Sequence, residues 1–160
     1  LRAWVVGVFR HQSLEEIAEK ARALGLDAVQ LHGRVEELDW AKFLPGVFVI
    51  RVFHMTPDEE KNAPTLHDAL RPGYHHIILL DTATQGGQDG GSGVSFNWSH
   101  VSNIPVPFLI AGGLTPDNVQ EALTQSLAAG VDTSSGVETE GQKDTAKITA
   151  YVENARRVLS

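Results

Sequence analysis

Two stretches of the chain combine strand-like apolar residues with glycine and serine. The first runs from Pro107 to Asn118 (PFLIAGGLTPDN), and the second runs from Gly130 to Glu138 (GVDTSSGVE). Each is predicted to be a buried strand that ends at small residues, where backbone N–H groups can approach an anion closely. Two adjacent strand ends of this kind would form a cradle for a phosphate group.

A helix is predicted to begin directly after the first stretch, over Pro116–Ser126. Thr115 is of a type that caps helices, and Pro116 suits the first helical position.

Asp81 is the candidate general acid. It follows the apolar strand Ile77–Leu80, which would hold its carboxyl group partly away from water and so suit proton transfer near neutral pH. The long loop from Asp81 to Asn97 is rich in glycine, including Gly93, and can fold over a ligand. An aspartate that only caps a turn is the alternative on the residues alone.

Polar residues within other predicted strands are further candidates for ligand binding. Gln30 and His32 lie two residues apart and therefore on one side of their strand, where they contact either a ligand or a neighbouring loop. Arg51 lies in a predicted strand, where burying an unpaired guanidinium is costly. It therefore either has a carboxylate partner, from the protein or a ligand, or lies at the end of the strand. Asp132 ends the last predicted strand and can accept hydrogen bonds from ligand hydroxyls.

Strands that alternate with helices must position these residues. The predicted strands are Trp4–Phe9, Ala28–Leu31, Phe48–Phe53, Ile77–Leu80, Phe108–Ala111 and Val131–Asp132. The predicted helices are Leu14–Leu24 capped by Ser13, Arg34–Leu44, Leu66–Leu70, Pro116–Ser126 and Thr145–Leu159. Strands that are apolar on both faces predict a parallel sheet covered by helices, in an α/β fold.

Two α/β architectures fit this order of elements. An eight-unit barrel takes about 31 residues per βα unit, so the chain holds only about six units and its length favours a doubly wound sheet. A phosphate cradle after the last two strands is instead typical of a (β/α)8 barrel.

Composition limits the classes of partner. The chain has 160 residues, which predicts a single domain over 1–160, and a net charge of −7 that argues against nucleic acid and anionic membranes. No apolar run approaches the roughly 20 residues of a membrane span. The chain has no cysteine, and its seven histidines show no spacing of metal ligands, so we expect neither a disulfide nor a metal site.

The motifs together resemble phosphoribosylanthranilate isomerase, the (β/α)8-barrel family of tryptophan biosynthesis. The stretches that carry the resemblance are Trp4–Phe9, Gly25–Gly33, Leu80–Thr82 with the glycine loop to Trp98, Leu109–Val119, Gly130–Glu138 and Gly141–Asp144. They run in the family's order over nearly the whole chain, and the extended glycine loop resembles fungal members, in which this domain often ends a multifunctional polypeptide.

The resemblance implies an Amadori rearrangement of N-(5-phosphoribosyl)anthranilate, without a cofactor, in the cytoplasm. It implies Asp81 as the general acid that opens the ribose ring. The residues implied for substrate binding are His32, Arg51, Gly93 and Asp132, and those implied for phosphate binding are Gly112, Gly113, Ser135 and Gly136. Other tryptophan-pathway domains are implied as fusion partners.

The chain departs from the family in one respect. The family's general base is a cysteine on its first strand, whereas this chain has no cysteine and its first strand resembles the family's third. About six of eight βα units, strands 3 to 8, are therefore expected. We expect either a piece of a complete enzyme or a truncated chain that is aggregation-prone or recruits a second copy or a separate N-terminal segment.

Two other functions stay open on the sequence. A chain without its general base could be an inactive phospho-sugar-binding fragment or an assembly module. An aldolase or epimerase is a weaker alternative, because no predicted strand carries a lysine for a Schiff base and no histidines and carboxylates converge at strand ends.

Overall fold

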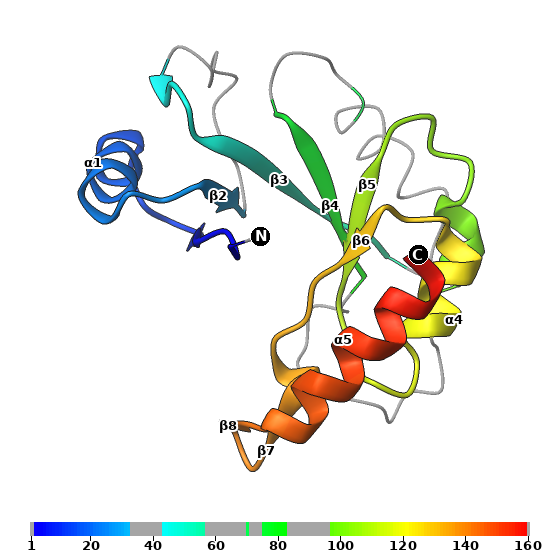
Figure 1. The fold of residues 1–160 in the computed structure, drawn as a ribbon. Coiled ribbons are helices and arrows are strands. Elements are labelled where there is room, and N and C mark those ends of the chain that lie inside the picture. Colours follow the sequence, from blue (N-terminus) through cyan, green and yellow to red (C-terminus); the bar gives the residue numbers. More distant parts are fainter. Residues whose placement is uncertain (1, 33–42, 57–69, 71–74, 83–96, 160) are drawn as a thin grey trace. The chain divides into compact units, whose positions relative to one another are not determined.

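The computed structural model describes residues 2–32, 43–56, 70, 75–82 and 97–159. Its strands are β1 (Val6–Phe9), β2 (Ala28–Leu31), β3 (Phe48–His54), β4 (Ile77–Asp81), β5 (Phe108–Ala111) and β6 (Gly130–Val131). These six strands form one sheet in the order of the chain, from β1 to β6 (Figure 1). The pairs β1–β2, β2–β3 and β5–β6 are parallel, which confirms the predicted α/β class.

Among the described residues, α-helices separate β1 from β2 and β5 from β6. The described helices are α1 (Leu14–Leu24), α4 (Val119–Ser126) and α5 (Thr145–Leu159), with short 3-10 turns η1 (Trp98–Val101) and η2 (Ser135–Val137). A two-stranded hairpin, β7 (Glu138–Thr139) and β8 (Gln142–Lys143), precedes α5 and was not predicted. Among the described residues, no helix combines the length and the apolar character that crossing a membrane requires.

The chain divides into two compact units, and the first comprises residues 1–53 and 66–79. Its helix α1 begins and ends as predicted, because Ser13 and Glu16 form a capping box and Gly25 ends the helix in the left-handed conformation. The helix buries Ile17, Ala18 and Ala21 in one core with residues of β1, β2 and β3. Burial of this apolar face stabilises the unit.

The first strand differs from its prediction. It was predicted over Trp4–Phe9, with an inner face that loses partners if the first two βα units are missing, but β1 begins at Val6. Val6 and Val8 are 39% and 58% exposed, as expected for a strand at one end of the strand order, and only Phe9 reaches the core formed with α1. The apolar sequence therefore predicted the strand but placed its start two residues early.

The second unit comprises residues 54–65 and 80–160. In β5, Phe108, Ile110 and Ala111 are buried. Helices α4 and α5 pack against each other in this unit (Figure 1). Helix α5 has its predicted bounds, and its buried residues are Tyr151 and Ala155.

Three observed element boundaries differ from those predicted from the sequence. Helix α4 begins at Val119 rather than Pro116, because the side chain of Asn118 closes a hydrogen-bonded turn before the helix. Strand β4 continues to Asp81, and β6 ends at Val131, so that Asp132 follows the strand. The helices predicted at 34–44 and 66–70 lie mainly outside the described residues, as does most of the glycine-rich loop.

Candidate active site

Asp81 lies at the carboxyl end of β4, which is the position predicted for the general acid. The three residues before it are buried, and the Asp81 side chain itself is 17% exposed. The Nδ1 atom of His54, the last residue of β3, lies 3.4 Å from Oδ2 of Asp81. The sequence analysis missed His54, although it directly follows a predicted strand, as Asp81 does.

Thr82 ties the end of β4 to the end of β5. Its backbone N–H donates to the carbonyl of Ala111 at 2.9 Å, and its hydroxyl donates to the carbonyls of Ala111 at 2.9 Å and Gly112 at 3.3 Å. In a trans peptide the carbonyl and the next N–H point in opposite directions. The contact with Gly112 therefore directs the N–H of Gly113 away from Thr82.

The turn after β5 depends on two glycines. Gly112 and Gly113 have φ angles of 94° and 63°, in the left-handed region that side chains rarely adopt. The amide of Asn118 donates to the carbonyl of Gly113 at 3.0 Å and accepts from the N–H of Thr115 at 2.8 Å. This turn replaces the helix start that was predicted at Pro116.

The segment after β6 packs directly on that turn. The N–H of Asp132 donates to the carbonyl of Ile110 at 2.9 Å, and the hydroxyl of Thr133 donates to the carbonyl of Leu114 at 2.7 Å. A Cβ atom on Gly136 would lie 1.8 Å from the oxygen of Leu114, so no larger residue fits without movement. The two stretches predicted to form one cradle therefore do contact each other.

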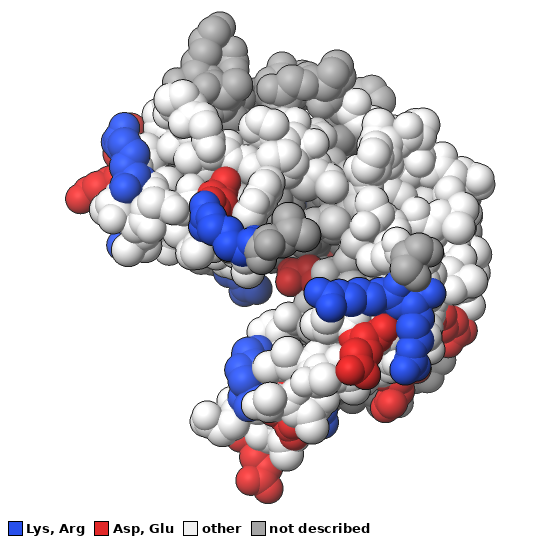
Figure 2. Space-filling view, viewed as in Figure 1, with Lys and Arg blue, Asp and Glu red and all other residues white. Residues whose placement is uncertain are grey.

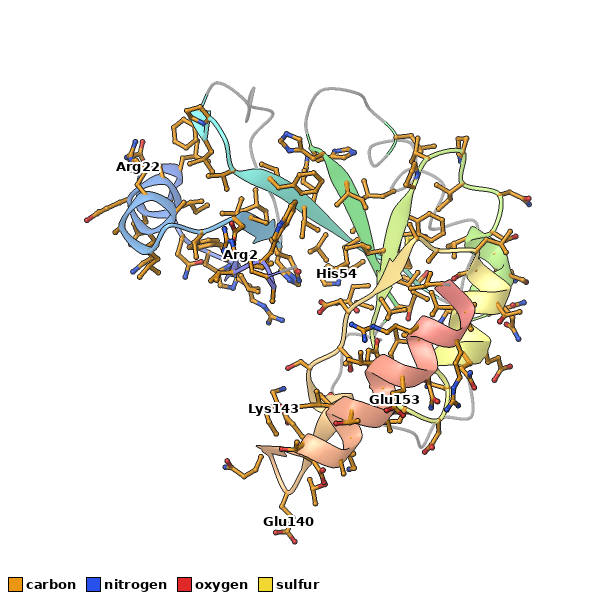
Figure 3. All side chains as sticks on the ribbon, viewed as in Figure 1. Arg2, Arg22, His54, Glu140, Lys143 and Glu153 are labelled. Atoms are coloured by element: carbon orange, nitrogen blue, oxygen red, sulfur yellow. The ribbon has the colours of Figure 1, made fainter. Side chains whose placement is uncertain are left out.

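Lys143 orients the second half of this site. Its Nζ donates to the carbonyl of Ser134 at 2.8 Å and also pairs with Glu138. Figure 3 labels Lys143 beside the β7–β8 hairpin. Because the Ser134 carbonyl points toward Lys143, the N–H of Ser135 points away from it.

Four backbone N–H groups remain open at these strand ends. Within the part of the chain that the structure describes, none of them donates a hydrogen bond; they belong to Gly112, Gly113, Ser135 and Gly136. Gly112 and Gly136 are half-buried, whereas Gly113 and Ser135 are exposed. Backbone N–H groups without a protein partner can donate to an anion. These are the four residues that the sequence predicted for phosphate.

Tyr151 of α5 lies near the same end of β6. Its side chain is only 6% exposed, and its hydroxyl has no hydrogen-bond partner among the described residues. Burial, followed by the negative charge of Asp132, raises the pKa of Tyr151 above its ordinary value. Tyr151 therefore stays a neutral phenol near the Asp132 carboxylate, a neighbour that the sequence did not reveal.

Of the remaining predicted residues, His32 and Arg51 belong to the first unit. In the first unit, Gln30 Nε2 and His32 Nε2 are 3.2 Å apart, so the predicted same-side pair does form. Also in that unit, the guanidinium of Arg51 lies 5.1 Å from the ring centroid of Phe53. Gly93 lies outside the described residues.

The charged side chains of both signs are interspersed over the visible face. Figure 2 shows Lys and Arg side chains next to Asp and Glu side chains around the hairpin and α5. The pairing of Lys143 with Glu138 is one such neighbour pair. An anion at the cradle would therefore be held chiefly by backbone N–H groups rather than by a cluster of cations.

Comparison with protein families gives one match over most of the chain. The family model described as N-(5'phosphoribosyl)anthranilate (PRA) isomerase matches residues 1–154. A multifunctional tryptophan biosynthesis protein of Schizosaccharomyces pombe is 44% identical over 148 residues, covering 92% of this chain and 18% of that protein. An N-(5'-phosphoribosyl)anthranilate isomerase of Eremothecium gossypii is 41% identical over 162 residues, covering 96% of this chain and 73% of that protein.

Solved structures agree with these relatives. A crystal structure of phosphoribosyl anthranilate isomerase from Thermotoga maritima has a TM-score of 0.77 and 34% identity, covering 96% of this chain and 73% of that one. A phosphoribosyl anthranilate isomerase in complex with reduced 1-(o-carboxyphenylamino)-1-deoxyribulose 5-phosphate has a TM-score of 0.75 and 30% identity, covering 96% and 72%. This likeness confirms the predicted (β/α)8-barrel class, and the described residues contribute a sheet of six strands to it.

Proposed function

Because the chain belongs to the N-(5'-phosphoribosyl)anthranilate isomerase family, we propose that it carries out the Amadori rearrangement of tryptophan biosynthesis. The substrate is N-(5-phosphoribosyl)anthranilate, and the product is 1-(2-carboxyphenylamino)-1-deoxyribulose 5-phosphate. The reaction is an aldose–ketose isomerisation. The chain spans 18% and 22% of the length of two multifunctional relatives, so this activity is proposed for the protein to which these residues belong.

The observation that carries the proposal is the set of open N–H groups after β5 and β6, beside the carboxyl end of β4. Thr82 and Lys143 hold carbonyls that direct the N–H groups of Gly113 and Ser135 away from themselves. Backbone donors bind a phosphate dianion without a large side chain in the way. In barrels of this class, phosphate sites lie after the last two strands, and catalytic residues lie at the carboxyl ends of strands.

Asp81 is the proposed general acid. It donates a proton to the ribose ring oxygen, the ring C–O bond breaks, and an iminium ion forms. A base then removes the proton from C2, and the resulting enolamine tautomerises to the ketone. The family's base is a cysteine, which these 160 residues do not contain.

The remaining roles concern substrate binding. The phosphate is proposed to bind the N–H groups of Gly112, Gly113, Ser135 and Gly136. Asp132 accepts from a sugar hydroxyl, while His32, Arg51 and Gly93 complete the substrate contacts. For Gly93, which lies outside the described residues, the resemblance alone supports this role.

The direct test is loss of substrate fluorescence on turnover. The assay uses the 160-residue chain alone and the chain mixed with a fragment that supplies the family's first two βα units. Turnover in either sample supports the function, and turnover only in the mixture assigns the base to the added fragment. Absence of turnover in both samples contradicts the proposal, and substrate binding without turnover favours the phospho-sugar-binding alternative.

The Asp81→Asn variant is the control for mechanism in that assay. It keeps the size of the side chain but cannot donate the acidic proton, so we expect kcat to fall by about 10²–10⁴ with a smaller change in KM. Unchanged kcat would remove Asp81 from its proposed role.

The partners and location follow from the same assignment. We propose a small phosphoribosyl substrate, fusion to other tryptophan-pathway domains or pairing with an N-terminal segment, and a cytoplasmic location. The multifunctional relatives of Schizosaccharomyces pombe and Phycomyces blakesleeanus support the fusion. The location rests on the pathway.

A further inference from the structure

The contact between His54 and Asp81 has no role in the mechanism above. We infer that His54 is a positioning residue that fixes the orientation of the Asp81 carboxyl group. The inference rests on the proposed function, because it gives His54 a purpose only if Asp81 transfers a proton.

The backbone brings these two residues together. His54 ends β3 and Asp81 ends β4, and the N–H of Met55 donates to the backbone carbonyl of Asp81 at 2.8 Å. Met55 is itself buried, with 3% of its side chain exposed. This hydrogen bond holds the carboxyl end of β3 beside that of β4. The backbone positions from which the side chains of His54 and Asp81 extend are therefore fixed.

The side chains meet through defined atoms. Nδ1 of His54 lies 3.4 Å from Oδ2 of Asp81, and the His54 and Asp81 side chains are 39% and 17% exposed. Figure 3 labels His54, the last residue of β3. The imidazole therefore borders the more shielded carboxyl group, where it restricts rotation of the carboxyl plane.

Orientation of an acid affects its rate of proton transfer. A general acid must place its proton within hydrogen-bond reach of the reacting oxygen, and a small misplacement lowers the rate steeply. A free aspartate carboxyl rotates about χ2 over a broad range, since this torsion lacks three sharp staggered wells. The imidazole beside Oδ2 narrows the range of χ2 in Asp81, and His54 need not contact the substrate to do so.

Three substitutions at this position separate positioning from bulk. His54→Leu replaces the imidazole with a branched apolar side chain, which keeps part of its bulk and removes the polar contact. His54→Asn places an amide close to the position of Nδ1, whereas His54→Gln extends its amide toward the position of Nε2. The control is His100→Leu, which makes the same change in η1, where His100 contacts Asn97 at 2.8 Å.

The experiment measures kcat and KM for each variant, with its thermal midpoint, in the form of the protein that shows turnover. We expect kcat of His54→Leu and of His54→Gln to fall by about 10- to 100-fold with KM changed less than about threefold. His54→Asn should restore most of the rate, and His100→Leu should keep the wild-type kcat. If His54→Leu does not fold, the difference in kcat between His54→Asn and His54→Gln still tests whether His54 positions Asp81.

Two results would overturn the inference. One is wild-type kcat in His54→Leu, and the other is equal loss in His54→Asn and His54→Gln. Both presuppose turnover by the unmutated protein. Absence of that turnover contradicts the proposed function instead, so the two failures are distinguishable.

Discussion

Strands β1 and β5 are both four residues long and mainly apolar, yet their environments differ. In β1, Val6 and Val8 are 39% and 58% exposed. In β5, Ile110 is fully buried and Phe108 is 3% exposed. The first strand has one neighbour in the described sheet, whereas β5 lies between β4 and β6.

The difference extends to the residues that follow each strand. After β1, the side chain of Gln12 accepts from the N–H groups of Arg10 and His11, in an exposed turn. After β5, the turn at Gly112 and Gly113 is held by side chains from two other segments of the unit. An apolar strand thus positions a site only where neighbouring segments also fix the turn that follows it.

The largest expected effect comes from truncating one side chain in each strand. Ile110→Ala should lower the free energy of unfolding by about 2–5 kcal/mol, because it leaves a cavity in a fully buried site. Val8→Ala should change it by less than about 0.5 kcal/mol, because Val8 is mainly exposed. Denaturant titration of both variants provides the measurement, and equal losses would show that the two strands are covered alike.

A smaller effect should follow a change in the segment after β6, which packs on the turn after β5. Gly136→Ala places a Cβ against the Leu114 carbonyl, and overpacking of this kind costs about 1–3 kcal/mol and displaces the loop. We therefore expect a lower thermal midpoint and a raised KM for substrate. The matched control is Gly141→Ala, which has φ of 74° but open space around a Cβ, so it should leave KM unchanged. A wild-type KM in Gly136→Ala would remove this loop from the phosphate site.

The smallest effect at neutral pH is expected for Tyr151→Phe. Its hydroxyl has no described partner, so its loss should change stability by less than about 1 kcal/mol at pH 7. Burial and the charge of Asp132 raise the pKa of Tyr151 in the folded state. Stability from this group is complete below the ordinary tyrosine value of 10.0 and is lost as pH rises above it, because only the unfolded chain ionises.

Unfolding measured from pH 7 to 11 tests that expectation. The wild-type protein should lose more stability than Tyr151→Phe above pH 10.0. Parallel curves for the two proteins would show that Tyr151 ionises as readily in the folded state as in the unfolded chain. In that case the Tyr151 hydroxyl would be less shielded from water than its 6% exposure indicates.

Local patterns predicted the elements of the fold well. The capping box at Ser13 and the glycine at 25 gave helix α1 its observed ends, because both devices act within one turn of the chain. The start of α4 was predicted three residues early, because Thr115 and Pro116 fit a helix start equally well by type. The amide of Asn118, which bonds Gly113 and Thr115, decided between the two starts.

The candidate site was predicted in part. Residue type predicted a phosphate cradle at the two small-residue strand ends, and the family resemblance implied Gly112, Gly113, Ser135 and Gly136 as its members. Their supporting contacts with Thr82, Thr133 and Lys143 were not recognisable, because each joins segments distant in the sequence. His54 could have been found by applying to β3 the strand-end rule that identified Asp81.

The sequence by itself determined the alternation of strands and helices, the glycines at the two strand ends and the position of Asp81 at the end of its strand. These follow from residue type and spacing, which act over a few neighbouring residues. Only the tertiary structure decided that β1 exposes Val6 and Val8, and that His54 lies 3.4 Å from Asp81. Burial and long-range contacts depend on which segments the folded chain brings together, and no local pattern contains that information.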